Sequence, residues 1–172
     1  METARARLGL EDRQARLTDI LMGEDELGVI VRAHIYVEHE LTEFIKARLN
    51  PPAALDAIRL DYSGRVRLAL ALGLLPELKS ALQFVGTLRN KFAHQLDSAI
   101  NKEDADNFEK ALGVLGKPIV DGAFQRLEDE WTAAQRGVPL TQMDSRTRVT
   151  LYFVAVWSAV AVAAAKSKGI GA

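Results

Sequence analysis

Proline is rare in this chain, and its five copies leave long stretches in which a helix can run without interruption. The prolines stand at positions 51, 52, 76, 118 and 139. Between them the chain is rich in Ala and Leu, which have high helix propensity. Apolar residues recur every three or four positions, and no run shows the strict alternation of a half-buried strand. The sequence therefore predicts an all-α protein, a bundle of six or seven helices.

The length of the chain corresponds to one ordinary domain. A chain of 172 residues can bury a core without disulfides, and it contains no Cys. We predict a single helical domain over 1–172, with an N-terminal helix over 1–22, a core over 25–115 and C-terminal helices over 119–166. Gly116 and Pro118 are expected to interrupt the chain between the last two parts. The expected N-caps of the main helices are Asp25, Asp61 or Ser63, Asn101, and Asp144 or Ser145.

Charge and composition exclude several classes of protein. With 22 basic and 23 acidic side chains the net charge is −1, so wholesale electrostatic binding of nucleic acid is not indicated. The absence of Cys excludes thiol nucleophiles and Cys-ligated zinc or iron–sulfur sites. Residues 1–20 are charged throughout and lack the apolar segment of a signal peptide. We expect a cytoplasmic protein.

One segment, 149–165, is free of charged residues over 17 positions. A helix that spans a membrane needs about 20 apolar residues, so this segment is at the short limit. It is either a C-terminal membrane anchor or a helix buried in the core or in a dimer interface. Nearly half of its residues are small or weakly apolar, which permits close helix packing. We expect the buried helix rather than a membrane anchor.

Two His–Glu pairs are candidate metal ligands. His34 and Glu38, and likewise His39 and Glu43, are four residues apart and share a helix face. The segment does not contain the HExxH pattern of zinc proteases, and a charged face with local ion pairs explains it equally. No GxxxxGK[ST] or GxGxxG loop is present. We expect neither a metal nor a small-molecule cofactor.

The segment 86–94, GTLRNKFAH, contains Arg89, Asn90 and His94 in the pattern R-N-x3-H. Asn90 and His94 share one side of a regular helix, and Arg89 lies about 100° away. The pattern resembles the R-x4–6-H motif of the HEPN superfamily, whose ribonucleases cleave RNA without metal and are commonly completed across a dimer. The resemblance implies a catalytic site of Arg89, Asn90 and His94. A His can move a proton of the ribose hydroxyl, and an Arg can hold the phosphate.

A second resemblance covers about 25–115. The order is E-x-x-L-x-x-F-I from Glu38, L-D-Y-S-x-R from Leu60, and L-R-N-K-F-A-H from Leu88. This order resembles the mannitol-repressor (MtlR-like) family. The resemblance implies a small helical transcription regulator without a recognisable DNA-binding motif.

Two hypotheses follow. The first, which we favour, is a non-enzymatic regulatory or interaction protein that acts as a homodimer through protein partners rather than by direct DNA readout. In this hypothesis Arg89 pairs with Glu38 or Glu43, and Asn90 and His94 are bonded inside the bundle. The alternative is a metal-independent HEPN-type endoribonuclease, such as the toxin of a toxin–antitoxin pair, with RNA as partner. It requires Arg89 and His94 to be exposed together in a positive cleft.

Two further basic positions bear on both hypotheses. Arg65 could join Arg89 in an anion-binding pocket, although solvated or ion-paired arginines are commoner. In a dimer, Arg65, Arg67, Arg89 and Lys91 of two chains could line one groove.

Overall fold

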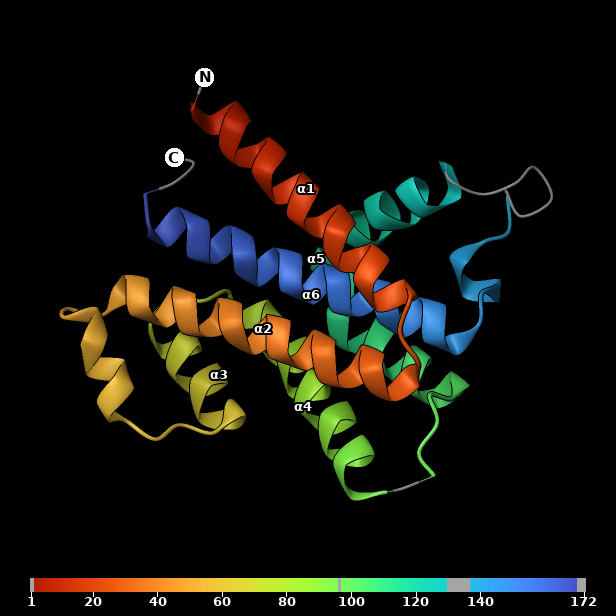
Figure 1. Cartoon of the computed structure of the whole chain (residues 1–172), viewed down its shortest axis with the longest axis horizontal. Coiled ribbons are helices and arrows are strands. Elements are labelled where there is room, and N and C mark those ends of the chain that lie inside the picture. Colours follow the sequence, from red (N-terminus) through yellow and green to blue (C-terminus); the bar gives the residue numbers. More distant parts are fainter. Residues whose placement is uncertain (1, 96, 130–136, 170–172) are drawn as a thin grey trace.

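The protein is described here by a computed structural model that covers residues 2–95, 97–129 and 137–169 (Figure 1). Over these ranges it is an all-α bundle without strands, which confirms the predicted fold class. The six α-helices are α1 (Glu2–Met22), α2 (Glu26–Arg48), α3 (Tyr62–Ala71), α4 (Lys79–His94), α5 (Lys102–Asp129) and α6 (Ser145–Ser167). Three short 3-10 helices occupy Pro52–Ala57, Pro76–Leu78 and Leu140–Gln142.

Four helices begin where the sequence places an N-cap. The side chains of Asp25, Asp61, Asn101 and Asp144 each accept a hydrogen bond from the backbone N–H three residues later, at 2.6 to 2.9 Å. Such a bond satisfies one of the free N–H groups of the first turn. The starts of α2, α3, α5 and α6 are therefore set by local chemistry, as predicted.

The interruption of α5 lies earlier than expected. The helix is kinked at Gly113, where φ is 59° and ψ is −158°. Only Gly adopts this backbone conformation without strain. Gly116 and Pro118, the predicted break, both fall inside the helical segment after the kink. Of the C-terminal helices predicted over 119–166, the part of this helix up to Asp129 is described, and positions 130–136 lie outside the described residues.

The apolar helix α6 lies at the centre of the bundle. It contacts α1, α2 and α5, and in Figure 1 it runs between α1 and α2 with α5 behind. Among the described residues it is the one helix long and apolar enough to cross a membrane, and 72% of its most apolar window is buried inside the protein. Its largest buried side chains, Tyr152, Phe153 and Trp157, fill the core. This arrangement fits the expected core helix.

Ion pairs attach neighbouring helices to this centre. Arg148 of α6 is buried and donates to Asp106 at 2.9 Å and to Glu109 at 2.8 Å, both on α5. Arg13 of α1 pairs with the buried Glu40 of α2. The first ion pair joins α6 to α5 and the second joins α1 to α2, while α3 and α4 contact α2 and each other. The candidate site lies where these last three helices meet.

Candidate functional site

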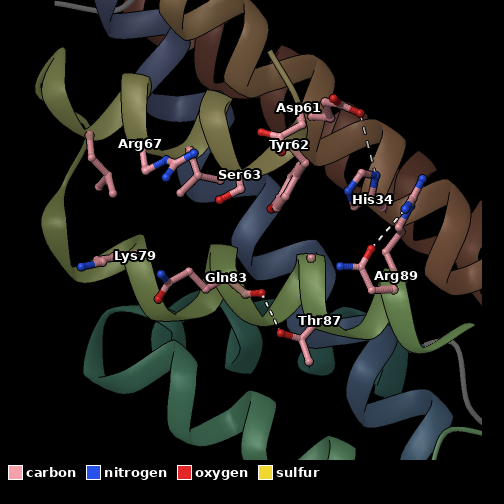
Figure 2. Close-up of a pocket in the computed structure, with 14 residues that line it drawn as sticks. His34, Asp61, Tyr62, Ser63, Arg67, Lys79, Gln83, Thr87 and Arg89 are labelled. Atoms are coloured by element: carbon pink, nitrogen blue, oxygen red, sulfur yellow. Dashed lines mark hydrogen bonds and ion pairs between the residues drawn. The ribbon is translucent and has the colours of Figure 1, made fainter. Parts of the chain in front are cut away.

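A cavity of about 630 Å³ opens between α2, α3 and α4 (Figure 2). The lining residues of α4 at positions 79, 83, 86, 87 and 90 share one helix face, and Arg89 lines the cavity from beside that face. Those from α3 follow the same spacing from position 62 to 70. The polar lining consists of His34 and Glu38 from α2, Asp61, Tyr62, Ser63 and Arg67 from the start and middle of α3, and Lys79, Gln83, Thr87, Arg89 and Asn90 from α4.

Three cationic side chains line this cavity. Arg67, Lys79 and Arg89 are exposed to solvent, and none of them forms an ion pair with any residue that the structure describes. The guanidinium Nη1 of Arg89 donates to Oδ1 of Asn90 at 3.1 Å, so these two side chains lie together although they are about 100° apart on the helix. The three cations remain available for an anion from outside the chain.

The two carboxylates of the cavity are already engaged. Glu38 accepts a hydrogen bond from Nε of Arg65 at 3.0 Å, and Arg65 itself does not line the cavity. Asp61 accepts from the backbone N–H of Gly64 at 2.6 Å as the N-cap of α3. Glu38 is therefore neutralised by a cation from outside the cavity, and three cations stand against Asp61, so the net charge of the remaining lining is positive.

His34 is the buried polar residue of the cavity wall. Its side chain is in contact with the ring of Tyr62, with ring centroids 4.4 Å apart, and the residue is only 7% exposed. Nδ1 lies 3.9 Å from Oε2 of Glu38, whereas Nε2 is buried without a hydrogen-bond partner among the described residues. Burial lowers the pKa of His34, the charge of Glu38 acts in the opposite direction, and the charge of Arg89 lowers it further. The imidazole is therefore kept in its neutral form.

Tyr62 holds the wall in place. Its hydroxyl donates to the carbonyl oxygen of Leu82 at 2.9 Å, and burial raises its pKa above the ordinary range. A Cβ atom on Gly86 would lie 3.1 Å from two carbons of the Tyr62 ring. Glycine at this position therefore lets the ring approach α4 closely. Tyr62 stays protonated and is suited to positioning His34 rather than to proton transfer.

The R-N-x3-H residues are only partly brought together. Arg89 and Asn90 line the cavity, whereas His94 is the exposed last residue of α4 and does not. The expected bonding of Asn90 and His94 inside the bundle is therefore wrong, because both side chains are exposed. The histidine that lines the same cavity as Arg89 is His34.

The expected ion pair of Arg89 is also wrong. Glu38 pairs with Arg65 from α3, and Glu43 pairs with Lys168 from the end of α6. Glu38 and Glu43 thus each form an ion pair with another cation, and Arg89 remains exposed on α4.

The His–Glu pairs of α2 do not assemble a metal centre in the described part of the chain, where no three His, Asp or Glu side chains are grouped closely enough to hold an ion. Sequence reasoning missed Lys79 and the role of His34 beside Arg89. The spacing of Lys79, Gln83 and Thr87 on one face of α4 was a signal for the first. The second depends on how α2 packs against α4.

Comparisons with family models, curated proteins and solved structures give no match to this chain. The resemblances to the mannitol-repressor family and to the HEPN superfamily therefore rest on the quoted residues and stay predictions.

Proposed function

We propose that this protein is a non-enzymatic regulator that binds a small phosphorylated molecule in the cavity between α2, α3 and α4 and acts through a protein partner in the cytoplasm. One observation supports this most directly. Arg67, Lys79 and Arg89 line a single cavity without ion-pair partners among the described residues, while Glu38 and Asp61 already accept hydrogen bonds. Guanidinium and ammonium groups in this state bind phosphate oxygens through charge-assisted hydrogen bonds.

The size of the cavity favours a small molecule. Its volume of about 630 Å³ lies within the range of about 300–1,000 Å³ that is usual for such ligands. A long polyanion would meet a protein of net charge −1, whose overall charge gives it no attraction for nucleic acid. Three cations, Arg67, Lys79 and Arg89, instead gather at this one cavity.

An apolar stripe on α2 supports the involvement of a protein partner. Leu27, Val31 and Ile35 are 52%, 41% and 58% exposed and recur every four residues. Successive residues of a helix are about 100° apart, so the stripe lies beside the face that carries His34 and Glu38. A partner that covers the stripe would contact α2 next to the cavity wall, where ligand binding can change its affinity.

The proposed partner in the stripe is a second copy of this chain, in keeping with the expected homodimer. Sedimentation velocity of the wild type and of Ile35→Glu tests this. We expect a dimer for the wild type and a monomer for the variant, because a carboxylate cannot be buried unpaired in an apolar interface. A monomeric wild type, or an unchanged dimer in the variant, would contradict the assignment of the stripe.

Binding of inorganic phosphate and pyrophosphate tests the ligand class. A ligand that binds the folded state raises the melting temperature with its concentration. We expect such a rise at constant ionic strength, with affinity reduced about tenfold in Arg89→Gln. Arg59→Gln is the matched control, because Arg59 is exposed and lies outside the cavity.

A variant with Arg67, Lys79 and Arg89 all replaced by Gln distinguishes phosphate binding in the cavity from a general effect of salt on the melting temperature. The rise should disappear in this triple variant and persist in Arg59→Gln. An equal rise in all proteins, or no rise in the wild type, would refute the proposal.

RNA cleavage remains a second candidate because Arg89, Asn90 and His94 are all exposed, which meets one of its two requirements; His94 does not share the cavity of Arg89. It would be measured as cleavage of single-stranded RNA in EDTA by the wild type, Arg89→Ala and His94→Ala. Cleavage that both variants lose while they keep their melting temperatures would favour the ribonuclease over the regulator.

A further inference from the structure

The cations of the cavity lie at its two ends. Lys79 is the first residue of α4, and Arg89 follows ten positions later, which corresponds to about 15 Å along the helix axis. Figure 2 shows Lys79 and Arg67 toward one end of the cavity and Arg89, beside His34, at the other. One phosphate group is far smaller than this separation. A single phosphate therefore engages one end and leaves the charge of the other end uncompensated.

Neutral polar side chains line the stretch between the two ends. Ser63, Gln83 and Thr87 line it with hydroxyl and amide groups. The hydroxyl of Thr87 donates to the backbone carbonyl of Gln83 at 3.2 Å, so its oxygen lone pairs are left to accept a hydrogen bond. These three side chains can form hydrogen bonds with ligand hydroxyl groups.

His34 adds a buried hydrogen-bonding atom at the Arg89 end. The carboxylate of Glu38 beside Nδ1 favours the tautomer with its proton on Nδ1. Nε2 is then a lone-pair acceptor, and it has no partner in the part of the chain that the structure describes. A buried acceptor of this kind is satisfied by a donor, which a hydroxyl provides and a fully ionised phosphate does not. The Arg89 end thus suits a phosphate with a hydroxyl group close to it.

From these three features we infer that the ligand is a polyhydroxylated molecule with a phosphate at each end, in the class of the sugar bisphosphates. One phosphate binds between Arg67 and Lys79, and the other binds Arg89 and Asn90. The hydroxyl groups contact Ser63, Thr87 and His34. This inference rests on the proposed function, since it specifies the ligand of the same cavity.

Isothermal titration with fructose bisphosphate, fructose monophosphate and fructose tests the inference. We expect the bisphosphate to bind at least about tenfold more tightly than the monophosphate, since each end adds charge-assisted hydrogen bonds, and fructose to bind weakest. Arg89→Gln, and separately Arg67→Gln with Lys79→Gln, should each lower the affinity for the bisphosphate to about that for the monophosphate. Arg59→Gln should bind all three as the wild type does.

The outcomes separate this inference from the proposed function. If fructose bisphosphate and fructose monophosphate bind with equal affinity, and the triple variant binds neither, the inference of a ligand with a phosphate at each end is overturned. Phosphate binding in the cavity would still stand. No binding of either compound, together with no response to inorganic phosphate or pyrophosphate, would overturn both. A short RNA oligonucleotide that binds more tightly than the bisphosphate, with the same dependence on Arg67, Lys79 and Arg89, would replace the small molecule by a nucleic-acid strand.

Discussion

His34 links the stability of the protein to pH, because its imidazole is buried beside Arg89. Its pKa in the folded state lies below the value of 6.5 for the free side chain, so the unfolded chain binds this proton more readily. The contribution of His34 to the free energy of unfolding is therefore complete above pH 6.5 and decreases as the pH falls below 6.5.

We therefore predict that the free energy of unfolding decreases between about pH 7.5 and pH 5.5, and that His34→Gln removes part of this decrease. Urea unfolding followed by circular dichroism at both pH values measures it. His94→Gln is the control, because it removes an exposed imidazole at the end of α4. A decrease in His34→Gln as large as in the wild type would contradict the prediction.

Two arginines provide a contrast between an exposed and a buried cation. Arg89→Ala should change the free energy of unfolding by no more than about 0.5 kcal/mol, because the side chain is exposed and strands no ion-pair partner in the described structure. Arg148→Ala should lower it by about 1–3 kcal/mol, since it removes the buried partner of Asp106 and Glu109, whose carboxylates stay partly solvated. Chemical denaturation of both variants measures the difference. A large loss in Arg89→Ala would show that Arg89 has a structural role.

The kink of α5 gives a prediction for a single helix. Gly113→Ala should lower the free energy of unfolding by about 1–3 kcal/mol, because Ala cannot adopt φ 59° without strain. No atom of the residues that the structure describes lies within 4 Å of an added Cβ at this position, so the loss would come from the backbone alone.

Gly122→Ala is the matched control on the same helix. An added Cβ there also meets nothing within 4 Å among the described residues, and the backbone is helical. The higher helix propensity of Ala should raise the stability by up to about 1 kcal/mol. The melting temperature and the free energy of unfolding in urea should therefore both decrease in Gly113→Ala and both increase in Gly122→Ala. Changes of the same sign in the two variants would contradict the kink.

For the whole molecule, the burial of α6 predicts behaviour in solution. Because α1, α2 and α5 already cover most of its apolar surface, the intact chain should stay in solution without detergent. Cell fractionation followed by sedimentation velocity measures this. Recovery in the membrane fraction alone would show that α6 leaves the bundle to insert in a bilayer.

The sequence by itself determined the helices and most of their starts. Helix propensity and the capping of a free N–H by Asp25 or Asp144 act within a few residues, so they can be deduced before any packing is known. The prediction of the break at Gly116 and Pro118 was wrong, because Gly113, Gly116 and Pro118 are all helix-breaking residues within six positions and the kink falls at the first of them.

Only the tertiary structure decided the site. The sequence singled out Arg89, but it could not show that Arg65 would take Glu38, that Lys168 would take Glu43, or that His34 and Lys79 would line one cavity with Arg89. These side chains belong to different helices or to opposite ends of one. Which of them meet depends on the crossing of α2, α3 and α4, and that crossing follows from the packing of their apolar faces, which no local sequence pattern encodes.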